Sequence, residues 1–152
     1  MTSSVKRMLE MKSINVEARG CEREDGETCL MIAANDGHLD ICRLLIDKGA
    51  HLEAKDIIGW TPSQLASWEG HIEIVRLLCD HGADVEARGE NGCRPLQTAA
   101  LKGHFSIVKE LFEVRNAEIN ARDDDGRTAL WYARVNRHAD IVSYLFSHGG
   151  IE

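Results

Sequence analysis

The stretch Gly70-His71-Ile72-Glu73-Ile74-Val75-Arg76-Leu77-Leu78 decides the fold, because close copies of it recur along the chain. The other copies begin at Gly37, Gly103 and Arg137, and the histidines at their second position are 33, 33 and 34 residues apart. A second glycine row keeps the same step, at Gly26, Gly59, Gly92 and Gly126. Self-similarity at a fixed period of this length indicates stacked structural repeats.

Each period predicts two short helices joined by a tight turn. Thr61 suits a helix N-cap and Pro62 the first helical position, where the missing N–H is not needed; Thr28 and Thr128 suit the same cap. The second helix carries apolar residues at helical spacing, such as Ile72 and Val75. Residues that tolerate the left-handed conformation follow the second helices, at Gly49, Gly82, Asn116 and Gly149. One helix pair cannot bury its own apolar face, so we expect a linear stack with roughly 10 Å between repeats.

Composition limits the class of protein. A length of 152 residues suits one domain, and a net charge of −7 disfavours nucleic acids and anionic membrane surfaces as partners. Residues 1–10 lack the apolar run of a secretory signal, and no stretch approaches the roughly 20 apolar residues that span a bilayer. Five cysteines without a C-x-x-C pair favour a reducing, intracellular compartment, cytoplasmic or nuclear.

The 33-residue step, together with the Gly-x-Thr-Pro, Gly-His-x-x-Ile-Val and Gly-Ala-x-Val phrases, resembles the ankyrin repeat. The resemblance implies an all-α solenoid of helix–turn–helix units with hairpin fingers. It also implies protein binding through the finger tips and the concave inner-helix face. We expect a single domain with four full repeats at 23–55, 56–88, 89–122 and 123–152, after an N-terminal half repeat at 4–22.

Several positions depart from the family pattern. The hairpin between Arg19 and Gly26 is longer than its equivalents, and one residue is inserted near Arg115–Asn116. Arg137 stands where the left-handed region normally takes a glycine, at a cost of about 1–2 kcal/mol. Arg134 replaces an alanine that would face a following repeat. We therefore expect a polar closing cap at this end of the stack.

No residue pattern predicts catalysis, a cofactor or a metal site. Histidines one repeat apart are too far from each other to share a metal, so we expect His38, His71, His104 and His138 to bond in the inter-helix turns. The run 123–126 lacks the ligand spacing of a calcium loop, and we expect its aspartates to be solvated at a finger tip. No phosphate-binding glycine motif occurs, and no nucleophile has a base within reach.

The candidate binding residues lie where stacking does not dictate the residue type. Apolar candidates lie on the second finger and along the inner helices: Ile57, Ile58, Trp60, Trp68, Leu101 and Val135. A solvent-facing apolar stripe indicates an interaction site, and tryptophan is enriched at binding hot spots. The polar rim is Glu69, Lys102, Glu90 and Arg127. The alternative is that the tryptophans pack locally; for Trp131 and Tyr132 we favour the core.

These features predict an adaptor, scaffold or inhibitor that binds another protein, as a monomer rather than a homo-oligomer. The alternatives are a structural element that pairs end to end through the N-terminal half repeat, or a regulatory subunit of an enzyme. By resemblance, Asn120 matches the hairpin asparagine that asparagine hydroxylases modify in some ankyrin repeats.

Overall fold

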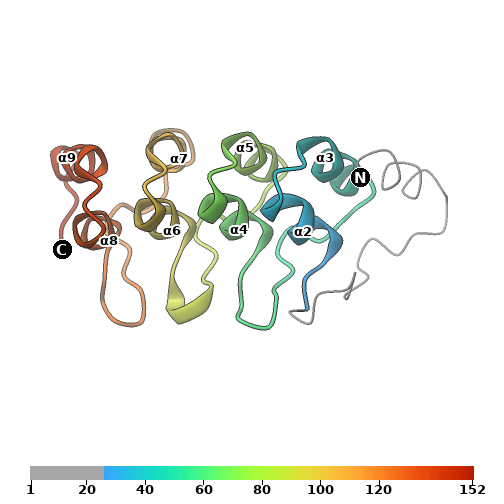
Figure 1. Cartoon of the computed structure of the whole chain (residues 1–152), viewed down its shortest axis with the longest axis horizontal. Helices are drawn as coiled ribbons and strands as arrows, with labels where there is room; N and C mark the ends of the chain where they lie inside the picture. The colour runs from blue at the N-terminus through green and yellow to red at the C-terminus, as the bar shows by residue number, and fades with distance from the viewer. Residues whose placement is uncertain (1–25) are drawn as a thin grey trace.

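The computed structural model describes residues 26–152, which form four helix pairs and no β-strand (Figure 1). The inner helices are α2 (Cys29–Asn35), α4 (Pro62–Glu69), α6 (Pro95–Lys102) and α8 (Ala129–Val135). The outer helices are α3 (Leu39–Asp47), α5 (Ile72–Asp80), α7 (Phe105–Lys109) with the π-helix η2 (Glu110–Val114), and α9 (Ala139–Ser147). The 3₁₀ turn η1 (Glu90–Gly92) lies in one of the fingers. The expected half repeat at 4–22 and the extended hairpin that follows Arg19 lie outside the described residues, apart from Gly26.

The two helices of each pair fall into two parallel rows (Figure 1). The inner helices stack on one another, and the loops that precede them project beyond this row as fingers (Figure 1). Alanines fill the inner row and leucines the outer row of the core, as at Ala33, Ala66, Ala99, Leu45 and Leu78. Small inner side chains let neighbouring helices approach closely, so the core runs without a break through all four described pairs.

The expected threonine caps are confirmed. The Oγ1 atoms of Thr28, Thr61 and Thr128 accept hydrogen bonds from the amides of Met31, Gln64 and Trp131 at 3.3, 3.4 and 3.3 Å. Inner helix α6 begins after Arg94, which lacks the capping oxygen. There the amide of Arg94 instead donates to Gln97 Oε1 at 2.8 Å. Three of the four described inner helices therefore begin at the residue that the local pattern predicts.

A histidine locks each repeat to the one before it. The Nε2 atoms of His71, His104 and His138 bond to the carbonyl oxygens of Asn35, Trp68 and Leu101 at 3.0, 2.8 and 3.0 Å. The space that each ring fills exists because the preceding repeat has a glycine there. A Cβ on Gly37, Gly70 or Gly103 would lie 2.7, 2.7 or 2.5 Å from the next histidine ring. The predicted role in the turns is confirmed for His71, His104 and His138.

Arg137 occupies the same turn in the last described repeat, with φ 62°. The left-handed conformation expected for this residue is confirmed. No further described repeat stacks beyond α8 and α9, so no histidine ring requires a glycine at this position (Figure 1). The cost of the left-handed arginine is therefore conformational, because its side chain projects into solvent.

The inserted residue expected near Arg115–Asn116 is absorbed inside the outer helix, where α7 widens into the π-helix η2. The amide of Arg115 closes this turn on Glu110 O at 3.2 Å, and Asn116 then takes the left-handed position with φ 57°. Glu110 is buried between Arg76 Nε at 2.9 Å and Arg115 Nε at 3.0 Å. Two guanidinium groups thus compensate a carboxylate at the position that Leu77 fills one repeat earlier.

The expected polar cap is confirmed in part. Arg134 forms an ion pair with Glu152, and Arg122 Nη2 donates to Glu152 O at 2.9 Å. Apolar side chains nevertheless remain at this end of the stack, since Phe146 is 68% exposed. Arg134 on α8 and Arg122 next to the fourth finger hold Glu152, whereas part of α9 stays uncovered.

Two glycine variants separate the cost of a left-handed backbone from the cost of steric overlap with a histidine ring. Gly70→Ala should lower the free energy of unfolding by more than Gly82→Ala, because only Gly70 has a histidine ring within contact distance. We expect about 1–2 kcal/mol for the conformational part in both variants. Arg137→Gly should raise stability by about 1 kcal/mol. Urea denaturation of the three variants measures these differences; equal losses for Gly70→Ala and Gly82→Ala would contradict the locking role of His104.

A serine in α4 generates a second prediction. Ser67 is fully buried at the position of Ala34 and Ala100, and its hydroxyl has no hydrogen-bond partner among the described residues. Ser67→Ala should therefore raise the free energy of unfolding by about 1 kcal/mol, because a desolvated and unbonded hydroxyl is removed. The control is Ser106→Ala at an exposed position, where we expect a change within about 0.5 kcal/mol. A loss of stability in Ser67→Ala would show that the hydroxyl is bonded in solution.

Candidate functional site

The second, third and fourth fingers are each closed by the same kind of backbone hydrogen bond. The amides of Asp56, Gly89 and Asp123 donate to the carbonyl oxygens of the residues four positions on, at 3.1, 2.8 and 3.1 Å. In the second finger, Asp56 Oδ1 also accepts from the amides of Ile58 and Trp60 at 3.0 and 2.8 Å. These bonds fix the finger backbone that carries the apolar candidates.

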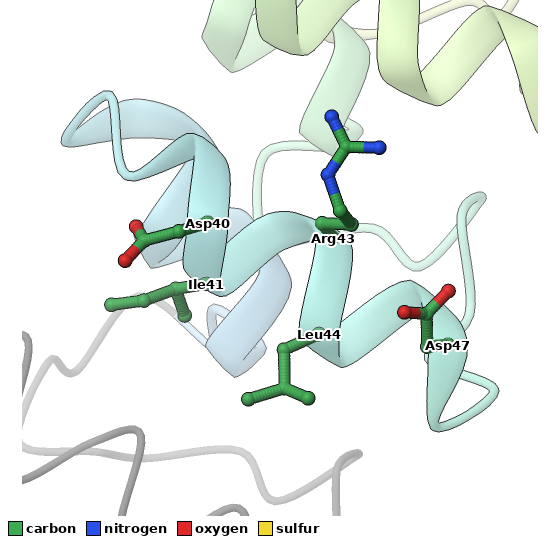
Figure 2. A pocket seen from close by; sticks show the side chains of 5 residues that line it. All are labelled: Asp40, Ile41, Arg43, Leu44 and Asp47. Carbon is green, nitrogen blue, oxygen red and sulfur yellow. The ribbon is translucent and has the colours of Figure 1, made fainter.

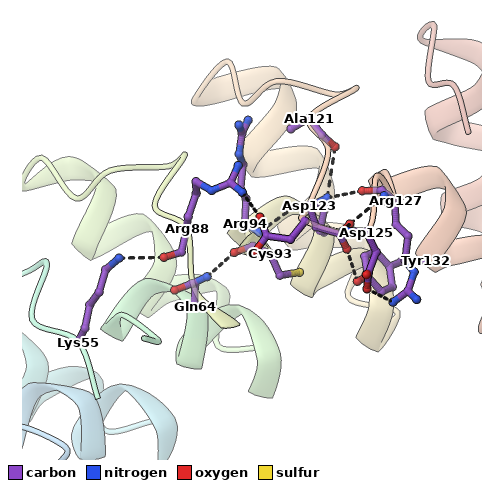
Figure 3. Close-up of polar contacts among 12 residues, drawn as sticks. Lys55, Gln64, Arg88, Cys93, Arg94, Ala121, Asp123, Asp125, Arg127 and Tyr132 are labelled. Carbon is purple, nitrogen blue, oxygen red and sulfur yellow. Dashed lines mark hydrogen bonds and ion pairs between the residues drawn. The ribbon is translucent and has the colours of Figure 1, made fainter. Parts of the chain in front are cut away.

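Neighbouring fingers are also joined to one another. Gln64 Nε2 donates to Cys93 O at 2.7 Å, and Gln97 Nε2 donates to Arg127 O at 2.7 Å (Figure 3). Lys55 Nζ reaches Arg88 O at 2.9 Å (Figure 3). Because the glutamines lie in the inner helices, each helix holds the base of the following finger. The finger row is consequently a preorganised surface and not a set of independent loops.

Four apolar side chains form what we call the tryptophan patch: Ile57, Ile58, Trp60 and Trp68. The two indole rings meet edge to face with centroids 5.0 Å apart, which ties the second finger to the end of α4. Both tryptophans are half-buried, whereas Ile57 is 71% and Ile58 50% exposed. The tryptophans thus pack on each other, as the local-packing alternative holds, and still present part of their surface to solvent.

The remaining apolar candidates lie on other inner helices. Leu101 is half-buried on α6, one repeat beyond Trp68, and Val135 is 57% exposed on α8, two repeats beyond it. All three occupy the same helical position, so they form one row along the stack. This arrangement does not bring Val135 to the tryptophan patch, and only a partner longer than one repeat would touch both.

The polar candidates differ in whether their charge is already engaged. Arg127 Nη1 pairs with Asp125 at 3.0 Å, and its guanidinium lies 4.7 Å from the Trp131 ring centre. Lys102 Nζ lies 4.4 Å from the centre of the Trp68 ring. Within residues 26–152, the exposed carboxylates of Glu69 and Glu90 form neither an ion pair nor a hydrogen bond.

A family model described as ankyrin repeats (3 copies) matches residues 1–89 and again residues 86–152. The chain belongs to the ankyrin repeat family. Ankyrin repeats are in general protein–protein interaction modules, and the family is typically non-enzymatic. No curated protein sequence matches this chain closely enough to count as a relative. None of the described helices has the length and apolar content needed to cross a membrane.

Two of the described thiols in this ankyrin chain are poorly suited to act as nucleophiles. Burial raises the pKa of the Cys42 thiol to about 12 and that of Cys79 to about 11, so both lack the thiolate that a nucleophile needs. A shallow hollow on α3 is lined by Asp40, Ile41, Arg43, Leu44 and Asp47, whose side chains point apart (Figure 2). Residues 26–152 contain no group of three potential metal ligands.

The expectation that the aspartates of the fourth finger are simply solvated is wrong for Asp123. Its side chain is 6% exposed and accepts from the amides of Asp125 and Arg127 at 3.0 and 2.8 Å. The Tyr132 hydroxyl donates to Asp123 Oδ2 at 2.5 Å, and burial, followed by this hydrogen bond, raises the pKa of Tyr132. Asp56 occupies the equivalent position two fingers earlier, and its carboxylate also accepts from the amides two and four residues on. The recurrence of aspartate at this position is the sequence signal that could have predicted a structural role for Asp123.

Two further expectations concern aromatic and amide side chains near the last repeat. Trp131 and Tyr132 are half-buried and meet edge to face at 5.1 Å, so neither is a full core residue. Asn120 Nδ2 donates to Gly149 O at 3.0 Å, and its Oδ1 accepts from the amide of Ile151 at 2.8 Å. The amide of Asn120 therefore fastens the last residues to the fourth finger, and its hydroxylation remains a prediction.

The Asp56 hydrogen bonds predict a local effect on the second finger. In Asp56→Ala, amide hydrogen exchange at Ile58 and Trp60 should accelerate by at least about tenfold, because each amide loses a charge-assisted bond. The amides of Asp125 and Arg127, which the equivalent carboxylate of Asp123 holds, serve as the internal control. Acceleration in both fingers would mean that the whole stack is loosened and that Asp56 does not act locally.

Proposed function

We propose that this ankyrin-repeat chain is an adaptor, scaffold or inhibitor that acts inside the cell, in the cytoplasm or nucleus, by binding another protein through the tryptophan patch. The observation that carries the proposal is the Trp60–Trp68 pair beside Ile57 and Ile58, which are 71% and 50% exposed at the finger tip. Stacking between repeats does not require apolar side chains at these positions. Exposed apolar surface rimmed by charged residues supports a contact with another protein.

The mechanism of binding is rigid complementarity. The second finger is held by Asp56, by the Trp60–Trp68 contact and by Lys55, which reaches the third finger. A partner therefore meets a surface that loses little conformational freedom on binding. We expect the backbone of the patch to move by less than about 1 Å between the free and bound states. Regulation of an enzyme by this chain would use the same surface.

The proposal is tested by affinity capture from reducing cell extract with the wild-type chain and three variants. The Trp60→Ala/Trp68→Ala variant should lose the captured partner, with an affinity weakened by about 2 kcal/mol or more. Trp131→Ala, which removes a half-buried tryptophan elsewhere, should retain it. Ile57→Asp/Ile58→Asp alters exposed side chains only and separates lost binding from lost folding.

Each remaining outcome points to another surface or function. A partner that binds all three variants equally would move the site away from the patch. If no partner is captured and the chain sediments as a concentration-dependent oligomer, the self-assembling element becomes the better description. In that case Phe146, exposed at the end of the described stack, is the first residue to change.

A further inference from the structure

We infer that the partner presents to the tryptophan patch an apolar side chain flanked on both sides by basic residues. This inference rests on the proposed function and names the chemistry of the segment that is bound. It follows from the positions of two carboxylates, and from the difference between charges that the fold has already neutralised and charges that it has left free.

The two carboxylates lie at opposite ends of the patch. Glu69 directly follows Trp68 at the end of α4 and is exposed. Glu90 lies on the third finger, next to Gly89, and is also exposed. The second and third fingers abut there, because a Cβ on Gly59 would lie 3.8 Å from the Gly89 carbonyl carbon. The apolar side chains thus run from a finger tip beside Glu90 to a helix end beside Glu69.

Three cations of the finger row are engaged elsewhere. Arg88 Nη2 pairs with Asp124 Oδ1 at 2.5 Å, and Lys55 Nζ is bound to Arg88 O at 2.9 Å. Arg127 pairs with Asp125. Glu69 and Glu90 have no such partner among the described residues. Of the three charges at the patch without an ion-pair partner among the described residues, Glu69 and Glu90 are therefore negative and Lys102, over the Trp68 ring, is positive. The balance is negative, as is the net charge of −7 of the whole chain.

A basic–apolar–basic segment satisfies both features at once. Its apolar side chain covers the tryptophans, while its basic side chains at either end meet Glu69 and Glu90 at the solvated rim. Rim charges of this kind accelerate encounter and reject partners of like charge, and each adds only modestly to affinity. An acidic segment would meet repulsion at both ends of the patch.

Removal of Lys102 should change the affinity for a basic segment in the opposite direction to removal of the two carboxylates. The ammonium group of Lys102 lies 4.4 Å from the centre of the Trp68 ring. It therefore occupies the ring face on which a cation of the partner would otherwise stack. Lys102 is exposed and has no carboxylate partner within the described chain. Its removal should therefore strengthen the binding of a basic segment, whereas the removal of Glu69 and Glu90 should weaken it.

The probe is a displayed library of random peptides, selected on the whole immobilised chain. We expect the selected peptides to carry Arg or Lys on both sides of a large apolar residue. A selected peptide should bind Glu69→Gln/Glu90→Gln about fivefold more weakly and Lys102→Gln about twofold more tightly. Raising the salt from about 50 to 500 mM should weaken wild-type binding several-fold and affect the Glu69→Gln/Glu90→Gln variant less.

The matched control is Asp40→Asn/Asp47→Asn, which removes the same charge from exposed carboxylates of the outer helix α3 that also form no ion pair among the described residues. Equal weakening in this control would overturn the inference, because the effect would then come from net charge alone. Selected peptides without basic residues would also overturn it, but would leave the proposed function intact if they require Trp60 and Trp68. Failure to select any peptide that requires the two tryptophans would overturn both.

Discussion

The contact between a histidine ring and the glycine of the preceding repeat sets the spacing on which the whole stack depends. His104 reaches Trp68 O at 2.8 Å only because Gly70 leaves room for its ring and adopts the left-handed conformation that closes α4. The same bond therefore engages a carbonyl oxygen in the last turn of α4 and fixes the distance between two repeats. Three such contacts in register make four short helix pairs into one continuous core.

Fixed helices in turn fix the fingers. Gln64 and Gln97, both buried, occupy inner-helix positions from which their amides reach the following finger. Variation is then tolerated where this framework makes no demand. The inserted residue widens the outer helix into a π-turn without disturbing the inner row, and Glu110 beside it is buried against two arginines. The residues of the tryptophan patch likewise lie at finger and helix-end positions where the stacking of repeats does not dictate the residue type.

Carboxylates in this chain fall into two physical classes that the sequence does not distinguish. Asp56, Glu110 and Asp123 are structural, since backbone amides or guanidinium groups surround them. Glu69 and Glu90 are exposed and have no ion-pair or hydrogen-bond partner within residues 26–152. Removal of the first class would change stability, whereas removal of the second would change what the surface attracts. Only the second class supports an argument about partners.

The sequence by itself determined what depends on the fixed period of the repeat and on backbone preferences over a few residues. The period, the threonine caps, the left-handed glycines and the left-handed Arg137 follow from local backbone preferences, which act over a few residues. Only the tertiary structure decided the burial of Asp123 beneath Tyr132, the meeting of Trp60 with Trp68, and the place where the helix absorbs its extra residue. These depend on which side chains the stack brings together and how much space it leaves between them. A pattern of residue types does not give the distances between side chains, nor which of several groups bonds to a given partner.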